Sequence, residues 1–336
     1  MMKMHIVFYE VNNEEKAYLK KYLSKNFSLE FYSEPLTVEN ANSAANADII
    51  SVFIFSKITQ PILDKLHNLK LISTRSTGFN HINLKAAQKI GISVCNVPYY
   101  GENTVAEHTF ALILALSRNL HKAYHRTNQG NFSIKGLRGF DLKGKTIGII
   151  GAGSIGTHVI KMAKGFGMNV VVFDPVENHI VKELLEIKYL PLEELLSVSD
   201  VISLHCPYNE NTHYLINMSN INRVKKGALF INTARAGIIE PSALYYAIDS
   251  GIFGGAGLDV FEGEDLINEE NQMLSKNVPV EQMESILKTN MLLRKENVII
   301  TPHIAFDSKE AVERILETTV ENIEAFSGSR KYYKVI

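Results

Sequence analysis

The chain has 336 residues, of which 46% are hydrophobic, and a formal net charge of −1 at pH 7. This length is too great for one compact core and suggests two domains. A nearly balanced charge gives no basic face, so nucleic acid is not an expected partner. The longest apolar stretch, Phe110–Ser117, is far shorter than the ~20 residues that cross a bilayer, so no membrane partner is expected. Only two cysteines occur, Cys95 and Cys206, far apart; they predict neither a disulfide framework nor a metal site, and they fit a soluble cytoplasmic protein.

Short apolar runs alternate with amphipathic segments along most of the chain, and they form two sets. The first set predicts strands at residues 5–10, 29–33, 49–55, 69–77 and 92–98, with helices at 13–24 and 84–90. The second set predicts strands at residues 145–151, 169–174, 200–206, 228–234, 253–260 and 297–303. These runs are apolar on both faces, which is typical of parallel strands covered by helices. The alternation therefore predicts an α/β fold with two doubly wound, Rossmann-like domains.

The segment between the two sets, Thr104–Gly130, reads as a long helix. Thr104 is placed to cap it, with Glu107 three residues later to complete a capping box. Its apolar residues occupy more than one stripe, so we expect it to pack against more than one surface. A last amphipathic helix, at residues 307–328, follows the second set of strands but could return to the first domain.

A glycine-rich turn, with Gly151, Gly153 and Gly156, stands between a predicted strand and a predicted helix. In a dinucleotide site these glycines allow the tight turn, the approach of the pyrophosphate and close helix packing, while the helix N-terminus faces the anion. The next strand ends on Asp174, where a carboxylate would bind the ribose hydroxyls and repel a 2′-phosphate, which favours NAD over NADP. Asp174 could instead be a plain turn residue before Pro175. The turn alone could also serve FAD or S-adenosylmethionine, but flavoproteins usually carry it near the N-terminus.

Three later strands of the second set end on residues that can do chemistry. Arg235, Asp259 and His303 follow successive apolar runs, and Glu264 comes five residues after Asp259. Ligands of doubly wound sheets bind at the carboxyl ends of the strands. Arginine can hold a substrate carboxylate and polarise a carbonyl, while histidine beside a carboxylate can give a proton. Each alone could be a surface cation, a solvated acidic loop or a structural histidine; together they predict hydride transfer to a 2-keto acid.

Six stretches of this sequence together resemble a known family. They are VPYYGENTVAEH, LKGKTIGIIGAGSIG, VISLHCPYNENTHYLIN, KKGALFINTARAGIIE, AGLDVFEGE and VIITPHIAF, and they span roughly residues 70 to 310 in the family's order. The chain resembles the D-isomer-specific 2-hydroxyacid dehydrogenases, and most of all their D-lactate dehydrogenase group. The resemblance implies an NAD-binding domain at residues 104–303, inserted into a substrate domain formed by residues 1–103 and 304–336.

The resemblance also implies roles for individual residues. Arg235 would bind and polarise the substrate, and His303 would be the acid/base, paired with Glu264. Substrate contacts would come from the backbone at Thr77 and Gly78, which receives the carboxylate, and from Tyr100. The NAD site would be lined by Gly151, Gly153, Ser154, Ile155, Gly156, Asp174, Cys206, Pro207, Asn211, Thr233, Ala234, Arg235 and Asp259.

The identity of the substrate stays open at this point. Pyruvate and D-lactate are expected, but the same chemistry on 2-ketoisocaproate, phenylpyruvate or glyoxylate is an alternative, and so is an NAD(H)-sensing binding protein. An insert, Asp265–Lys295, has a counterpart of similar length in the D-lactate group. A homodimer is expected, with the helix that starts at Thr104 as its contact, although this helix could equally be core between the domains.

Overall fold

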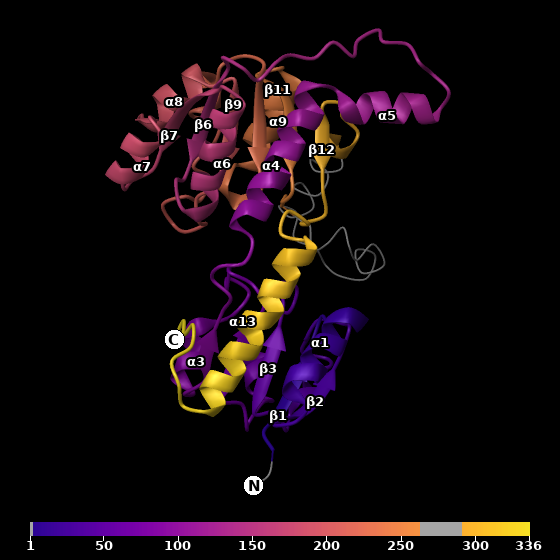
Figure 1. Cartoon of the computed structure of the whole chain (residues 1–336), viewed down its shortest axis with the longest axis vertical. Helices are drawn as coiled ribbons and strands as arrows, with labels where there is room; N and C mark the ends of the chain where they lie inside the picture. Colours follow the sequence, from indigo (N-terminus) through magenta and orange to yellow (C-terminus); the bar gives the residue numbers. More distant parts are fainter. Residues whose placement is uncertain (1–2, 263–290) are drawn as a thin grey trace. The chain divides into compact units, whose positions relative to one another are not determined.

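The computed structural model describes residues 3–262 and 291–336, and the chain forms two compact units (Figure 1). The first unit contains Met1–Tyr100 and Ser308–Ile336, and the second contains Gly101–Asp307. The second unit is therefore inserted into the chain of the first. Glu264 and most of the Asp265–Lys295 insert lie outside the described residues.

The first unit is built on a five-stranded parallel sheet of order β2-β1-β3-β4-β5. Its strands are β1 His5–Phe8, β2 Ser28–Phe31, β3 Ile49–Val52, β4 Leu71–Thr74 and β5 Ser93–Cys95. Its helices are α1 Asn13–Leu23, η1 Ala41–Ala44, α2 Gln60–Leu63, α3 Leu84–Lys89 and α13 Lys309–Ser327. The helices α1 and α13 pack together on one face with β1 and β4, and η1, α2 and α3 cover the other.

The second unit is built on a seven-stranded parallel sheet of order β12-β11-β10-β9-β6-β7-β8. The strands are β6 Thr146–Ile150, β7 Asn169–Phe173, β8 Lys188–Tyr189, β9 Val201–Leu204, β10 Ala228–Asn232, β11 Phe253–Leu258 and β12 Val298–Ile300. The helical elements are α4 Glu102–Ser117, α5 Leu120–Asn128, α6 Ser154–Gly165, α7 His179–Leu184, α8 Leu192–Val198, η2 Ile221–Arg223, η3 Ala236–Ile238 and α9 Pro241–Asp249. The strand order reverses between β6 and β9, which is the point where doubly wound sheets bind nucleotides.

Side chains of the second sheet alternate between two cores because successive residues of a strand face opposite sides. On β10, Leu229 and Ile231 face the core shared with α4 and α6, whereas Phe230 faces the core shared with α8 and α9. Figure 1 shows α4 and α6 next to each other, and they are in contact. Helices thus cover both faces, and the predicted α/β class with two doubly wound sheets is confirmed.

Two local predictions around α4 are wrong. Gly101, not Thr104, is the N-cap, and the first helical bond runs from Val105 N to Gly101 O; Thr104 is a buried residue of the first turn. The expected single long helix is two helices, because Asn119 has a left-handed backbone with φ of 51°. Asparagine tolerates this conformation better than most residues, so it can end one helix and start another.

The predicted strands all form, but most are shorter at their carboxyl ends than expected. The run at residues 297–303, for example, is a strand only over Val298–Ile300. The remaining residues of each run make the turns that follow the strands, and several predicted site residues, such as Asp174, Asp259 and His303, lie in these turns. Among the residues described, no helix has the length and apolar character needed to cross a membrane.

Candidate active site

The turn after β6 is closed by Gly151, whose φ is +97°. A Cβ built on this residue would lie 2.6 Å from Cys206 N and 2.7 Å from His205 C, the main chain that follows β9. A side chain here would meet both a strained backbone and a steric clash. Gly151 therefore lets the ends of β6 and β9 approach each other where the strand order reverses.

The other two glycines of the turn have different surroundings. A Cβ on Gly156 would lie 2.0 Å from the carbonyl oxygen of Gly151, so α6 can lie this close to the turn only with glycine there. A Cβ on Gly153, the N-cap of α6, would have no protein atom within 4 Å. The N-terminus of α6, where Ser154 and Ile155 begin the helix, thus has open space beside it. Backbone N–H groups at such an end, with the helix dipole, favour an anion such as a pyrophosphate.

Asp174 follows β7 and lies next to this turn. Its Oδ2 accepts a hydrogen bond from Ala152 N at 2.8 Å and its Oδ1 accepts one from Val176 N at 2.9 Å. Asp174 therefore does act as a turn residue, as the alternative interpretation of this position expected. The carboxylate is only half buried, and each oxygen can accept a further bond, so it also retains capacity for ribose hydroxyls.

The segment after β9 carries Cys206, Pro207 and Asn211. Burial raises the pKa of the half-buried Cys206 thiol to about 11, so the thiol is protonated at neutral pH. Burial lowers the pKa of the neighbouring His205 to about 3, and its Nε2 is 2.8 Å from Ser203 Oγ. Pro207 and Asn211 are exposed in the following turn, where Asn211 N donates to Asn209 Oδ1. His205 and Cys206 are therefore both uncharged at neutral pH.

The end of β10 is held in place by Asn232, which is 1% exposed. Its Oδ1 accepts from Ala234 N at 3.0 Å, and its Nδ2 donates to Arg235 O at 3.0 Å. The Arg235 guanidinium donates to Ala234 O at 2.7 Å, and Thr233 Oγ1 is 3.0 Å from Thr109 Oγ1 on α4. The sequence therefore turns sharply after the strand and places the arginine at the carboxyl edge.

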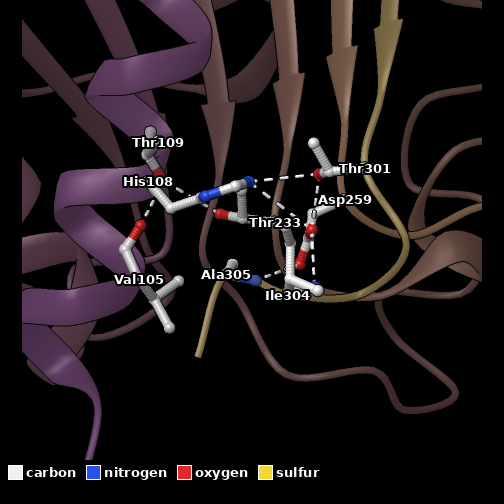
Figure 2. Close-up of polar contacts among 8 residues, drawn as sticks. All are labelled: Val105, His108, Thr109, Thr233, Asp259, Thr301, Ile304 and Ala305. Atoms are coloured by element: carbon white, nitrogen blue, oxygen red, sulfur yellow. Dashed lines mark hydrogen bonds and ion pairs between the residues drawn. The ribbon is translucent and has the colours of Figure 1, made fainter. Parts of the chain in front are cut away.

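Asp259 follows β11 and is 1% exposed. Figure 2 shows its polar contacts with the residues around it. Its carboxylate accepts from Thr301 Oγ1 at 2.5 Å, from Ile304 N at 2.9 Å and from Ala305 N at 2.9 Å. These donors all belong to the turn that follows β12. Three hydrogen bonds compensate this buried carboxylate for its loss of contact with water. Asp259 therefore organises this turn from the neighbouring strand.

His303 lies in the middle of the turn that Asp259 organises. Its backbone N–H donates to Asp259 O at 3.1 Å and to Thr301 O at 3.0 Å, and its φ is 56°. A left-handed histidine is uncommon and persists where the surroundings determine it, as they often do at functional sites. In addition, Asp259 N donates to Asn232 O, so the main chain links the ends of β10, β11 and β12.

The structure brings most of the predicted residues to one edge, but not all of them. The glycine turn, Asp174, Cys206, Arg235, Asp259 and His303 follow six different strands of one parallel sheet, at its carboxyl edge. Thr77, Gly78 and Tyr100 belong to the first unit, where Thr77 Oγ1 donates to Val97 O at 2.9 Å. Tyr100 O accepts from Arg314 Nε of α13 at 2.6 Å. Glu264 is outside the described residues.

Sequence reasoning missed three polar residues that support this edge. They are Asn232, His108 and Thr301. The side chain of Asn232 bonds the turn of Arg235, that of His108 bonds Thr301 in the turn of His303, and that of Thr301 bonds Asp259. His108 carried a usable signal, because it lies on the same helical stripe as the buried residues Val105 and Leu112. A polar side chain on an apolar stripe calls for a polar partner.

In the first unit, sequence reasoning also missed Arg75, which precedes the Ser76–Gly78 loop and is 1% exposed. Its guanidinium donates to Tyr9 O and Glu10 O at 2.7 Å each and to Ser51 Oγ at 3.1 Å. Burial lowers the pKa of this arginine. The residue thus fixes the start of the Thr77–Gly78 loop to the ends of β1 and β3.

Comparison with known proteins agrees with this geometry. The family profile described as "D-isomer specific 2-hydroxyacid dehydrogenase, NAD binding domain" matches residues 110–305. D-lactate dehydrogenase of Escherichia coli K12 is 37% identical over 318 residues, which cover 92% of this chain and 93% of that protein. The structure of Aquifex aeolicus D-lactate dehydrogenase complexed with NAD and lactic acid is 40% identical, with a TM-score of 0.87 and 96% of each chain covered. The structure of a D-2-hydroxyisocaproate dehydrogenase is 29% identical, with a TM-score of 0.82 and 99% of each chain covered.

The profile covers more than half of the chain, and the E. coli relative covers nearly all of it. The matched segment contains the glycine turn, Asp174 and the three strand ends that carry Arg235, Asp259 and His303. The chain therefore belongs to the D-isomer-specific 2-hydroxyacid dehydrogenase family, and it is an NAD-dependent D-2-hydroxyacid dehydrogenase.

Proposed function

We propose that this dehydrogenase reduces pyruvate to D-lactate. The main support is similarity: the E. coli relative is named a D-lactate dehydrogenase, and the A. aeolicus structure is described as a complex with NAD and lactic acid. The D-2-hydroxyisocaproate dehydrogenase supports a second candidate, the same reaction on a bulkier keto acid, at lower identity. Glyoxylate and phenylpyruvate are further substrates to compare with these two.

The proposed roles follow from the chemistry of a keto acid. Bound NADH supplies a hydride to the keto carbon, and the protein must hold the substrate and provide one proton. Arg235 is proposed to bind the carboxylate and polarise the carbonyl, because its planar fork presents several donors at fixed positions. His303 is proposed to give its proton to the carbonyl oxygen, which becomes the hydroxyl group. Glu264 is proposed to pair with His303.

The residues around the glycine turn fit the adenosine and pyrophosphate parts of NAD. The open space at Gly153, beside the N-terminus of α6, suits the pyrophosphate. The half-buried carboxylate of Asp174, at the end of the next strand, suits the ribose hydroxyls. The residues proposed to line the rest of the cofactor site are Ser154, Ile155, Cys206, Pro207, Asn211, Thr233, Ala234, Arg235 and Asp259.

The first unit is proposed to bind the substrate carboxylate through the backbone at Thr77 and Gly78. This loop is fixed on both sides: Arg75 anchors its start, and Asn96 Nδ2 donates to Thr77 O at 2.8 Å. Tyr100, whose carbonyl oxygen is held by Arg314, is proposed to contact the substrate through its side chain. A fixed loop lowers the entropy cost of binding a small anion.

We also propose a homodimer, with its contact on the later part of the segment Thr104–Gly130 and on the residues that follow it, rather than on α4. Most of α4 is buried within the second unit, against α6, β10 and β11, so little of it is left for a partner. Four strongly exposed apolar side chains lie instead on α5 and the segment after it: Leu120 at 62%, Tyr124 at 68%, Phe132 at 78% and Ile134 at 85% exposed. A cluster of this kind is typical of an interface between proteins.

A panel of keto acids tests the proposed substrate. NADH oxidation is followed with pyruvate, 2-ketoisocaproate, phenylpyruvate and glyoxylate, and NAD reduction is followed with D-lactate and L-lactate. The proposal predicts the highest kcat/KM for pyruvate and a reaction with D-lactate only. A higher kcat/KM for 2-ketoisocaproate or phenylpyruvate would support the second candidate. NADH binding without turnover of any acid would favour an NAD(H)-sensing protein and contradict the enzyme.

A further inference from the structure

His108 on α4 reaches the turn that carries His303, although the two are far apart in the sequence. Its Nε2 is 3.1 Å from Thr301 Oγ1 and 3.5 Å from Asp259 Oδ1 (Figure 2). Its side chain is 19% exposed, so the contact is largely shielded from water. Most other buried side chains of α4 are apolar, and Thr109 contacts Thr233 of the neighbouring turn.

The hydrogen bonds around Thr301 decide which atom of His108 is protonated. A threonine hydroxyl has one hydrogen, and Thr301 donates it to Asp259 Oδ1. The oxygen of Thr301 must therefore accept at its contact with His108. Nε2 of His108 consequently carries a hydrogen and points it at Thr301 Oγ1, with Asp259 Oδ1 as a more distant acceptor.

Asp259 also holds the turn around His303. Asp259 accepts from the backbone N–H groups of Ile304 and Ala305, and its carbonyl oxygen accepts from His303 N. The left-handed backbone of His303 is thus framed on both sides by groups bound to Asp259. His108 donates from α4 to Thr301, and Thr301 in turn donates to the Asp259 carboxylate, a charge-assisted bond that is stronger than a neutral one.

We propose that His108 is a positioning residue for the acid/base histidine: through Thr301 and Asp259 it fixes the turn from which His303 acts. This inference rests on the proposed role of His303. It makes His108 part of the dehydrogenase reaction without contact to substrate or cofactor. The effect belongs to the proton-transfer step, so it appears in kcat more than in cofactor binding.

Substitutions at position 108 test the inference in the full-length enzyme. His108→Leu removes the donor, and kcat for pyruvate reduction is expected to fall about tenfold, which corresponds to about 1.4 kcal/mol. The Kd of NADH, measured by fluorescence titration, is expected to stay within about twofold of the wild type. His108→Gln keeps an N–H donor near the position of Nε2 and is expected to recover most of kcat. If His108→Leu does not fold, His108→Asn, which is too short to reach Thr301, takes its place against His108→Gln.

A double substitution tests whether His108 acts through Thr301. His108→Leu combined with Thr301→Val is expected to lower kcat no further than Thr301→Val alone, because both remove the same connection. Glu107→Gln is the matched control, since Glu107 is exposed on the same helix and its side chain accepts from Asn103; its kcat is expected to equal that of the wild type. Fully multiplicative losses in the double variant, or no recovery by His108→Gln, would contradict the inference.

His303→Asn separates a failure of this inference from a failure of the proposed function. If His303→Asn is inactive and His108→Leu has wild-type kcat, only the role of His108 is refuted. If His303→Asn turns over pyruvate like the wild type, the acid/base assignment fails, and the positioning role fails with it.

Discussion

Replacing a glycine of the turn after β6 by alanine should lower either the stability of the apoenzyme or its affinity for NADH, depending on which of the three glycines is replaced. In the structure, Gly156 faces the protein and Gly153 faces open space. Gly156→Ala is therefore expected to destabilise the apoenzyme, whereas Gly153→Ala is expected to leave its stability nearly unchanged and to weaken NADH binding. Each variant adds one methyl group to the wild-type enzyme, so each serves as a control for the other.

The size of the Gly156→Ala effect follows from its contact. The added Cβ would lie 2.0 Å from Gly151 O, far below an ordinary contact, so α6 or the turn must move. Overpacking of this kind costs about 1–3 kcal/mol. The higher helix propensity of alanine returns up to about 1 kcal/mol. If the clash costs about 3 kcal/mol, the free energy of unfolding falls by about 2 kcal/mol. This corresponds to a fall in Tm of about 4–8 °C for a unit of this size.

The Gly153→Ala effect is on the ligand instead. Gly153 has φ of −67° and ψ of −162°, which alanine can adopt, and no protein atom lies within 4 Å of the added methyl. Tm of the apoenzyme should therefore change by less than about 2 °C, which corresponds to about 0.5 kcal/mol. The methyl would occupy the space proposed for the pyrophosphate, so Kd for NADH should rise about tenfold or more.

Differential scanning calorimetry of the apoenzyme and fluorescence titration with NADH measure the two effects separately. Gly151→Ala is expected to lower Tm as Gly156→Ala does. Position 151 has a φ of +97°, and an added Cβ would clash with Cys206 N. An equal loss of Tm in Gly153→Ala and Gly156→Ala would refute the distinction. Unchanged NADH affinity in Gly153→Ala would refute the placement of the pyrophosphate.

Three further predictions concern other parts of the molecule. Asp174→Ala should weaken NADH binding and raise the relative use of NADPH, as measured by kcat/KM for each cofactor; an unchanged preference would contradict the ribose role. Burial opposes the ionisation of Asp200, but hydrogen bonds from Lys225 and from a backbone amide outweigh burial and lower the pKa of this carboxyl. The stabilisation from the ionised Asp200 is therefore fully present above about pH 4, and it is lost as the pH falls through the lowered pKa. The stability difference between the wild type and Asp200→Asn should therefore shrink in denaturant titrations below pH 4, and a constant difference would refute this. Tyr124→Glu with Phe132→Glu should convert a dimer into a monomer in light scattering, and a dimer that resists both changes would place the interface elsewhere.

Much of the fold could be predicted from the sequence because parallel strands leave a strong local signal. The apolar runs at residues 228–234 and 253–260 are buried on both faces, so their composition alone identifies β10 and β11. The same signal predicted that Arg235, Asp259 and His303 follow strand ends, and the structure confirms this placement. Their roles in the reaction stay predictions.

What the sequence did not predict depends on contacts between distant residues. The bond from His108 to Thr301 spans 193 positions, and no local pattern indicates it. The carbonyl acceptors of Arg75 lie 65 and 66 positions before it, on the end of β1. Thr104 has the residue type of a cap, but the chain enters α4 three residues earlier, at Gly101. In each case the packing of other elements outweighs the local preference.

Arg235 and His303 were expected to act on one substrate, and in the structure hydrogen bonds link the two turns that carry them. Asn232 fixes the turn of Arg235, Asp259 fixes the turn of His303, and the N–H of Asp259 donates to Asn232 O. The two turns are thus parts of one hydrogen-bonded edge. Such preorganisation lowers the cost of aligning a cation and a proton donor in the transition state.

The proton-donor role of His303 is tested most directly by the turnover of His303→Asn with saturating NADH and pyruvate. General acid catalysis by a positioned side chain contributes about 10²–10⁴-fold. The account predicts that kcat falls by at least about 100-fold while the Kd of NADH, measured by fluorescence on the same preparation, remains within about twofold of the wild type. A kcat close to that of the wild type would contradict the central claim.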